Sequence, residues 1–324
     1  MTVVRHLPRN SVLVTCIASI GKNAVLKVAG ACNQQINAVI PNADHDPKFL
    51  YYIFDSNKAR LVGRAGITAT SILSKGTFIQ LAFPIPPTRA EEEAIAEALS
   101  DADAFVESLE QLLVKKRSLK QGAMRELLTA TRRLPGFDGE WETKQLGTVL
   151  KFQVGFPFSS SFFNTEGQGI RLVKNRDLKS DDQVFYYSGK YDSTFLVEDG
   201  DLLVGMDGDF VPCLWRKGSS LLNQRIGRIV PQGGLNRTFA SYYLISPLHQ
   251  IEVATSKTTV KHLSHGDVER IERPLPGLNE QAAIAAVLSD MDAEVAELEA
   301  KVRKARDLKQ GMMQELLTGR IRLV

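Results

Sequence analysis

Residues Pro87–Leu134 read PTRAEEEAIAEALSDADAFVESLEQLLVKKRSLKQGAMRELLTATRRL, and the chain repeats this stretch at its other end. The second copy is PGLNEQAAIAAVLSDMDAEVAELEAKVRKARDLKQGMMQELLTGRIRL, residues Pro276–Leu323. The copies align without a gap over 48 positions, with 26 identities at a constant offset of 189. Self-similarity of this kind indicates a duplicated structural unit.

Both copies carry apolar residues at alternating spacings of four and three. Such a heptad pattern keeps an apolar stripe facing a partner helix. No proline lies between Glu91 and Thr129, so the pattern predicts a helix of 39 residues, about 58 Å long. We expect the seam of the helix pair to consist of Ile95, Leu99, Val106, Leu109 and Leu113 in the first copy and Ile284, Leu288, Val295, Leu298 and Val302 in the second.

The charges along the repeated stretch indicate how two such helices pack. Glu91–Glu110 holds eight acidic residues and no basic one, whereas Lys115–Arg133 holds seven basic residues and one acidic one. The second copy shows the same asymmetry. Antiparallel packing would set acidic ends beside basic ends, so we expect an antiparallel coiled coil. Gly122 and Gly311 recur in the middle of the helices and suggest a close crossing or a bend.

The similarity continues upstream more faintly, and it divides the chain into four segments. Cys32–Pro41 matches Leu222–Pro231, Tyr51-Tyr52 matches Tyr242-Tyr243, and Leu73-Ser74 matches Leu263-Ser264. Short β-rich runs alternate with helical stretches in both upstream regions, which predicts an α+β class. The predicted segments are a first globular domain at 1–86, a long helix at 87–134, a second globular domain at 135–275 and a second long helix at 276–324.

The two globular domains are unequal in length. The first has no counterpart of roughly Gly136–Tyr191. Either the first domain is reduced or the chain is a truncated version of a longer protein, and truncation is the favoured interpretation.

Composition excludes several classes of protein. The chain has 324 residues, of which 40 are Lys or Arg and 37 are Asp or Glu, so its net charge is +3. A charge this close to zero does not by itself indicate a nucleic-acid partner. Three scattered cysteines fit a reducing cytoplasm rather than a disulfide framework or a zinc site. No stretch is long and apolar enough to span a bilayer. Phosphate-loop, hydrolase-elbow and zinc-protease motifs are absent, so the sequence predicts a non-enzyme with no catalytic residue, metal or cofactor.

Polar loops supply candidate contacts to nucleic acid. Cations and hydroxyls suit phosphate oxygens, and amides suit base edges. For any one of these residues, a solvated loop remains an equally good interpretation. The candidates are Lys22, Thr68, Thr70, Ser71, Lys174, Asn175, Arg176, Lys179, Lys257, Thr258, Thr259 and Lys261.

The order of these features resembles the specificity subunit of type I restriction–modification systems. The resemblance rests on the duplicated helix ending in LKQG-x-M-x-ELLT, the run Leu7–Lys22, the Thr-x5-Leu-Ser segments Thr68–Ser74 and Thr258–Ser264, and the helix start Pro274–Ile284. It covers essentially the whole chain. The chain departs from the family by lacking the N-terminal part of its first target-recognition domain.

The resemblance implies a fold and a function. Two α/β target-recognition domains would each read one half of a split double-stranded DNA target, and the antiparallel helices would fix the spacing between the half-sites. The helices would also dock two adenine-methyltransferase subunits, to which restriction subunits add, while the subunit itself performs no chemistry. Two alternatives remain: a half-type or silent specificity module, and a coiled-coil scaffold without DNA function.

Overall fold

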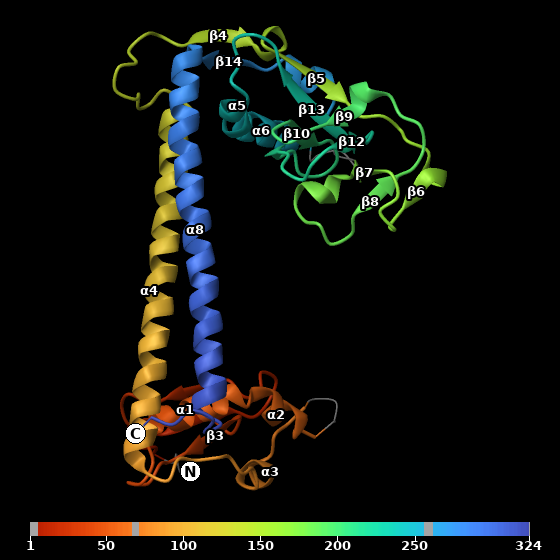
Figure 1. Cartoon of the computed structure of the whole chain (residues 1–324). Helices are drawn as coiled ribbons and strands as arrows, with labels where there is room; N and C mark the ends of the chain where they lie inside the picture. The colour runs from red at the N-terminus through yellow and green to blue at the C-terminus, as the bar shows by residue number, and fades with distance from the viewer. Residues whose placement is uncertain (1–5, 67–70, 256–261, 324) are drawn as a thin grey trace. The chain divides into compact units, whose positions relative to one another are not determined.

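The structure, a computed structural model, describes residues 6–66, 71–255 and 262–323. The chain divides into two compact units. The first unit comprises Met1–Lys115 with Val295–Val324, and the second comprises Lys116–Glu294. Each unit therefore contains one globular part and a stretch of both long helices (Figure 1).

The first unit is built on a small antiparallel sheet with the strand order β2-β1-β3. Its strands are β1 (Val12–Thr15), β2 (Asn23–Val25) and β3 (Ile36–Val39). Its short helices are α1 (Pro47–Ser56), α2 (Lys58–Gly63) and α3 (Lys75–Ile79). Val12 and Val14 alternate along β1 and pack with Phe49 and Ile53 of α1, so the pleat of one strand and one face of one helix make the core.

The second unit contains the same arrangement with one strand more. Its first sheet has the order β11-β10-β13-β5, in which β10 (Leu202–Gly205), β11 (Pro212–Leu214) and β13 (Ile226–Pro231) correspond to β1, β2 and β3. The additional strand is β5 (Leu150–Val154). A two-stranded ladder joins β4 (Glu142–Gln145) to β14 (Glu272–Leu275). The helices are α5 (Arg237–Tyr243), α6 (Ile245–Thr255) and α7 (His265–Glu269).

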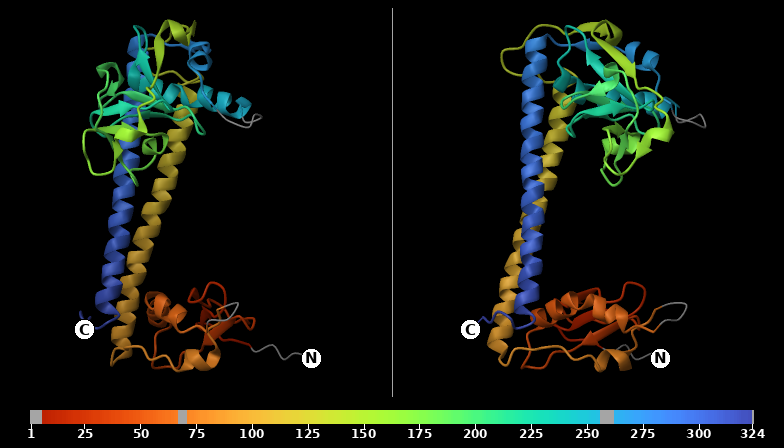
Figure 2. Two further views of the ribbon diagram at one scale, coloured as in Figure 1. Left: turned by 90° about the vertical axis from the view of Figure 1, so that its right-hand side faces the viewer. Right: turned by 45° about the vertical axis from the view of Figure 1, so that its right-hand side comes forward.

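A further sheet of five strands distinguishes the second unit (Figure 2). Its order is β6-β8-β7-β12-β9, formed by β6 (Phe163–Asn164), β7 (Ile170–Val173), β8 (Phe185–Tyr187), β9 (Leu196–Val197) and β12 (Ser220–Leu222). No counterpart of this sheet occurs among the described residues of the first unit. Three strands of this sheet, β6, β7 and β8, come from the stretch Gly136–Tyr191, which also contains β4 and β5. This stretch has no equivalent in the first half of the sequence.

The recurring Leu-Ser step has a structural explanation. Leu73 and Leu263 are fully buried, and the serine that follows each caps a short helix. The Ser74 hydroxyl accepts a hydrogen bond from Thr77 N at 3.1 Å, and the Ser264 hydroxyl accepts one from Asp267 N at 3.2 Å. A serine oxygen that satisfies a first-turn amide stabilises a helix start by about 1 kcal/mol.

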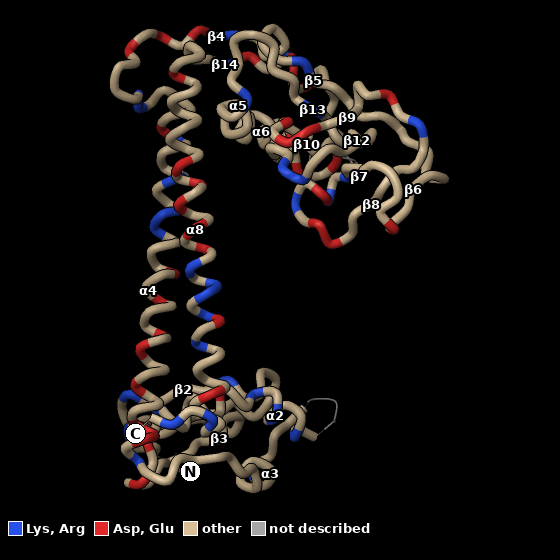
Figure 3. Tube along the Cα trace, viewed as in Figure 1, with Lys and Arg blue, Asp and Glu red and all other residues tan. Residues whose placement is uncertain are grey.

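The long helices are α4 (Arg89–Leu127) and α8 (Leu278–Leu316), each of 39 residues. The predicted length is confirmed, with the first helix lying two residues earlier than expected. In the first unit Asp103 pairs with Lys309 at 2.5 Å and Glu110 with Arg306 at 2.5 Å. In the second, Lys116 pairs with Glu294 at 2.6 Å and Lys120 pairs with Asp292. From one ion pair to the next, the residue number rises on α4 and falls on α8, so the two helices pack antiparallel. Opposite charges face each other along the helices (Figure 3).

The seam residues fall into three groups. Leu109, Leu113, Val295, Leu298 and Val302 contact one another in a cluster of their own. Ile95 and Leu99 belong instead to the core of the first globular part, and Ile284 and Leu288 to that of the second. Val106 is partly buried and lines a cavity of about 640 Å³ beside Lys309 and Met313. The predicted stripe therefore serves both helix pairing and the attachment of each globular part.

A tyrosine and a Glu or Gln side chain attach each globular part to the long helices at equivalent positions. Glu92 of α4 accepts hydrogen bonds from Asp46 N at 2.6 Å and from His45 Nδ1 at 2.8 Å. Its counterpart Gln281 accepts one from Asn236 N at 2.7 Å. The hydroxyls of Tyr52 and Tyr242 also bond to the long helices, to Asp103 and Asp292 respectively.

One of the two explanations expected for the recurring glycines is wrong. No close crossing explains Gly122 and Gly311, because a Cβ added at either would meet no atom within 4 Å. Within the described residues, no helix is both long and apolar enough to cross a membrane.

Candidate nucleic-acid interface

The candidate interface consists of two turn sites, one in each unit, built by the same backbone contacts. The first turn site comprises Cys16–Lys22 with Ser71 and Ile72, and the second comprises Met206–Phe210 with His262. Leu73 N donates to Cys16 O at 2.8 Å, and Leu263 N donates to Met206 O at 2.8 Å. Isolated bridges join Ile17 to Ile72 and Asp207 to His262. The repeat therefore places a hairpin turn beside the same downstream segment twice.

The turn itself demands an unusual backbone in both units. Ala18 has φ 59° and its counterpart Gly208 has φ 84°. Glycine adopts the left-handed region without steric cost, whereas alanine adopts it at a cost of about 1 kcal/mol. The first turn therefore has the same conformation as the second, with backbone strain at Ala18. The shared conformation holds two different sequences, Ile17-Ala18-Ser19 and Asp207-Gly208-Asp209, on one scaffold.

Lys22 and Ser71 lie in the first turn site and are exposed. Lys22 N donates to the Thr15 hydroxyl at 3.0 Å, which fixes the backbone while the ammonium group faces solvent. Lys58 lies beside the turn, since a Cβ at Gly21 would come within 2.9 Å of its Cγ. The candidates Thr68 and Thr70 lie outside the described residues.

Asn175 and Lys179 lie at the second turn site, although they are 32 and 30 residues from their partners Asp207 and Asp209 in sequence. Asn175 Nδ2 donates to Asp207 O at 2.5 Å. A Cβ at Gly205 would lie 1.9 Å from Asn175 Oδ1, so only a glycine at this position leaves room for the Asn175 side chain. The Lys179 ammonium pairs with Asp209. Four further candidates of this unit lie outside the described residues, shortly before His262 in sequence: Lys257, Thr258, Thr259 and Lys261.

Two carboxylates organise the second turn site, which the sequence had not indicated. Asp207 contacts Arg225 Nη1 at 3.2 Å and His262 Nδ1 at 3.0 Å. The Asp207-Gly-Asp209 stretch reads from sequence as an ordinary solvated loop. In the structure these acids instead hold Lys179, Arg225 and His262 around the turn. Asp207 and its partners Arg225 and His262 are 18 and 55 residues apart in sequence, so no local sequence pattern could indicate these ion pairs.

Lys174 and Arg176 lie apart from this cluster, against the five-stranded sheet. Lys174 Nζ lies 3.1 Å from the ring centroid of Phe185 and 5.0 Å from that of Phe163. The Arg176 guanidinium lies 5.2 Å from the Phe185 centroid. Burial lowers the pKa of Lys174, and the neighbouring Arg176 charge lowers it further. Lys174 therefore packs on aromatic rings, which is a cation–π contact rather than an exposed phosphate contact.

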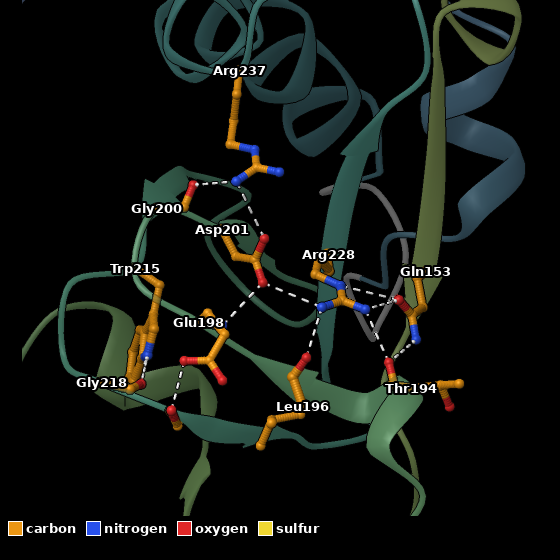
Figure 4. Close-up of polar contacts among 11 residues, drawn as sticks. Gln153, Thr194, Leu196, Glu198, Gly200, Asp201, Trp215, Gly218, Arg228 and Arg237 are labelled. Atoms are coloured by element: carbon orange, nitrogen blue, oxygen red, sulfur yellow. Dashed lines mark hydrogen bonds and ion pairs between the residues drawn. The ribbon is translucent and has the colours of Figure 1, made fainter.

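A polar network around Arg228 attaches the five-stranded sheet to the repeated one (Figure 4). The guanidinium donates to Gln153 Oε1 on β5 at 2.6 Å, to Thr194 O at 2.9 Å and to Leu196 O on β9 at 2.7 Å. Asp201 accepts a further bond from Arg228 at 3.2 Å and contacts Arg237 at 3.5 Å. The counterpart of Arg228 in the first unit is Ala38, so the network accompanies the extra sheet.

The two globular parts differ in net charge. Residues 1–86 contain nine basic and three acidic residues, whereas residues 135–275 contain 16 and 17. Lys22, Lys58, Arg64 and Lys75 are exposed and make no ion pair within the part of the chain that the structure describes. A basic surface attracts polyanions, and the first globular part carries the larger net positive charge. No group of three or more His, Cys, Asp or Glu among the described residues could hold a metal ion.

Known proteins are similar to this chain in sequence. A specificity subunit of the type I restriction enzyme EcoBI from Escherichia coli is 35% identical over 186 residues, 56% of this chain and 39% of that protein. The MjaVIII specificity subunit from Methanocaldococcus jannaschii is 23% identical over 332 residues, 94% of this chain and 76% of that protein.

Solved structures agree on the fold. The crystal structure of a type I restriction-modification S subunit from M. genitalium matches 95% of this chain and 83% of its own, with a TM-score of 0.64 at 16% identity. A chain from a study of complex assembly in a type I R-M system matches with a TM-score of 0.60 at 18% identity, over 97% of this chain and 83% of its own. A sequence profile described as "Type I restriction modification DNA specificity domain" matches residues 5–115 and 138–305. The chain therefore belongs to the type I restriction–modification DNA specificity family.

Proposed function

We propose that this chain is the DNA sequence-recognition subunit of a type I restriction–modification complex and that each unit reads one half of a split target. The observation that carries the proposal is the pair of turn sites. One backbone scaffold occurs twice, fixed by the Leu73 and Leu263 bonds, and its turn carries Ile17-Ala18-Ser19 in one unit and Asp207-Gly208-Asp209 with paired cations in the other. Two readers of different half-sites need this combination of equal geometry and unequal chemistry.

The long helices would dock methyltransferase subunits, two in number. Leu119 on α4 and Leu308 on α8 are equivalent by the offset of 189, and both are exposed. Exposed apolar side chains that recur at equivalent positions favour two identical docking events. Restriction subunits would then join through the methyltransferases, and the chain itself would contribute recognition without chemistry.

Co-expression with a methyltransferase subunit of this system tests the assignment. We expect a complex on gel filtration whose DNA affinity falls linearly on a plot of log K against log salt, with a slope of roughly −0.9 per phosphate contact. A complex that binds DNA without salt dependence, or not at all, would favour the scaffold alternative.

Substitutions at the two exposed leucines test docking separately from recognition. The double variant Leu119→Glu/Leu308→Glu should fold, as circular dichroism would show, but lose the methyltransferase subunits on gel filtration. The matched control is Leu112→Glu, an exposed leucine of α4 whose counterpart is Lys301. If the double variant retained both partners, the docking surface would lie elsewhere.

A further inference from the structure

A short turn that lies beside each turn site is a recurring feature that the proposed function does not use. The two stretches are residues 33–36, Asn-Gln-Gln-Ile, and residues 223–226, Asn-Gln-Arg-Ile. In each stretch the isoleucine N–H donates to the asparagine carbonyl oxygen, at 3.2 Å in the first and at 2.9 Å in the second. Such a bond closes a β-turn, and we call these two stretches the glutamine turns.

The same backbone contact fixes each glutamine turn to its turn site. Cys16 N donates to Gln35 O at 3.0 Å, and Met206 N donates to Arg225 O at 3.0 Å. Arg225 also pairs with Asp207 of the second turn site at 3.2 Å. Each unit therefore presents a turn whose sequence differs between the units next to a turn whose sequence is nearly the same.

The turn geometry explains the recurring asparagine but not the glutamine that follows it. Asn33 Oδ1 accepts a hydrogen bond from Gln35 N at 3.0 Å, and Asn223 Oδ1 accepts one from Gln224 N at 2.9 Å. Asparagine commonly stabilises turns in this way. Gln34 and Gln224 are exposed, and their side chains make no hydrogen bond within the part of the chain that the structure describes. A β-turn does not require glutamine at this position, so the fold gives no reason for the recurring amide.

The sequence around the glutamine has changed between the two units. Of the ten positions that align Cys32–Pro41 with Leu222–Pro231, four are identical, and these are Asn, Gln, Ile and Pro. Gln224 is exposed in the unit that carries the additional five-stranded sheet, so that sheet does not cover it. An exposed polar side chain that recurs in a loop without an internal partner favours a contact with another molecule.

We propose that the side-chain amides of Gln34 and Gln224 each donate a hydrogen bond to a phosphate oxygen of the DNA backbone. This contact rests on the proposed function, in which the two units bind the two half-sites of one target. Half-sites that differ in their bases share the same sugar-phosphate backbone. Identical side chains therefore suit the backbone, and the differing turns suit the bases. The two amides would fix the register of each unit on the duplex without reading its sequence.

The charges beside each glutamine turn favour a phosphate over a protein partner. Arg225 follows Gln224 directly and is exposed. Among the described residues it contacts Asp207 through Nη1, so its other N–H groups can reach a phosphate. In the first unit Thr15 N donates to Lys22 O at 2.8 Å, which places this exposed lysine one residue from the contact that holds the glutamine turn. A cation beside a neutral amide donor suits an oxygen that accepts hydrogen bonds and carries negative charge.

Alanine variants of the full chain, in complex with the methyltransferase subunit, test the proposal. Gln34→Ala and Gln224→Ala should each weaken DNA binding by about tenfold, equally on duplexes with and without the target sequence. The slope of log K against log salt should not change, because the amide is neutral. Circular dichroism should not change either, since both side chains are exposed. Gln232→Ala is the matched control and should bind like the native chain, because Gln232 is an exposed glutamine at the other end of β13 whose counterpart is Asn42.

Duplexes that carry a single neutral methylphosphonate linkage locate the contact. At one linkage in each half-site, the loss of affinity measured with the native chain should disappear in the matching alanine variant. Gln224→Lys should bind about as tightly as the native chain and steepen the salt slope by about 1, because an ammonium group can replace the amide at a phosphate.

Three results would overturn the proposal while leaving the proposed function intact. Alanine variants that bind every duplex like the native chain would remove the amides from the interface. A changed methylation motif in one half-site would show that the glutamine contacts a base. Loss of the methyltransferase subunit on gel filtration would show that it contacts that protein. A native complex that does not bind DNA would instead contradict the proposed function itself.

Discussion

The hydroxyl of Tyr242 donates a hydrogen bond to Oδ2 of Asp292 at 2.6 Å. Lys120 of α4 pairs with the same aspartate and lies 5.6 Å from the tyrosine ring centroid. The first unit repeats the arrangement with Tyr52, Asp103 and Lys309. Each globular part is thus fastened to both long helices by one phenol, one carboxylate and one ammonium group.

Removing the Tyr242 hydroxyl tests the strength of this attachment. We expect Tyr242→Phe to lower the free energy of unfolding by about 1 kcal/mol, because a charge-assisted hydrogen bond is lost while the ring packing remains. Urea unfolding measures the change. Tyr191→Phe, at an exposed tyrosine, is the control and should leave stability unaltered.

Alkaline pH should weaken the same attachment. Burial raises the pKa of Tyr242 to about 12, and the hydrogen bond to Asp292 adds to the effect. Because the folded-state pKa lies above the ordinary value of about 10, the stabilisation is fully present below pH 10 and is lost as pH rises toward 12. The stability difference between the native chain and Tyr242→Phe should shrink across that window. A difference constant up to pH 12 would contradict this account.

The helix seam can be tested with two leucines of the same helix. Leu298 is 7% exposed in the cluster with Leu113, whereas Leu308 is 63% exposed. Leu298→Asp should cost about 3 kcal/mol or more, since it buries a charge without a partner. Leu308→Asp should change stability by less than about 0.5 kcal/mol. Thermal unfolding followed by circular dichroism distinguishes the two, and equal losses would remove Leu298 from the seam.

The Arg228 network should stabilise the second unit and its extra sheet. Arg228→Ala leaves Gln153 and Asp201 without their main partner, and we expect a loss of about 3 kcal/mol. Arg216→Ala, at an exposed arginine nearby in sequence, is the control. Hydrogen exchange should quicken at β9 and β5 in the Arg228 variant alone. Unchanged exchange there would show that packing, not this network, joins the sheets.

Asp207 should restrain the cations of the second turn site. Asp207→Asn removes the negative charge that holds Arg225 and His262, so those groups become available to phosphates. We expect non-specific DNA affinity to rise and the salt slope to steepen by about 1. Glu140→Gln, an exposed acid of the same unit, should alter the slope little. A slope unaffected by Asp207→Asn would place the turn outside the interface.

The sequence predicted the long helices well because their signals are local and repeated. Heptad spacing, absent prolines and opposed charge blocks all lie within 48 residues, and they gave the length of α4 and α8 and their antiparallel packing. The small sheets were harder. Strands of two to four residues, such as β6 and β9, carry too few positions for an alternating pattern to emerge.

The candidate interface was predicted only in part. Lys22 and Asn175 do lie at the turn sites, but residue type alone could not show that Lys174 packs on Phe185 or that Asp207 gathers its cations. Those relationships depend on contacts between segments far apart in the chain.

Mapping methylated adenines tests the central claim most directly. The chain would be co-expressed with the methyltransferase subunit of its system, and the modified adenines would be sequenced from a random DNA pool. Recognition by two units predicts a split motif with two specific parts separated by a spacer of fixed length. A complex that forms but methylates a single undivided half-site, or no site at all, would contradict the account.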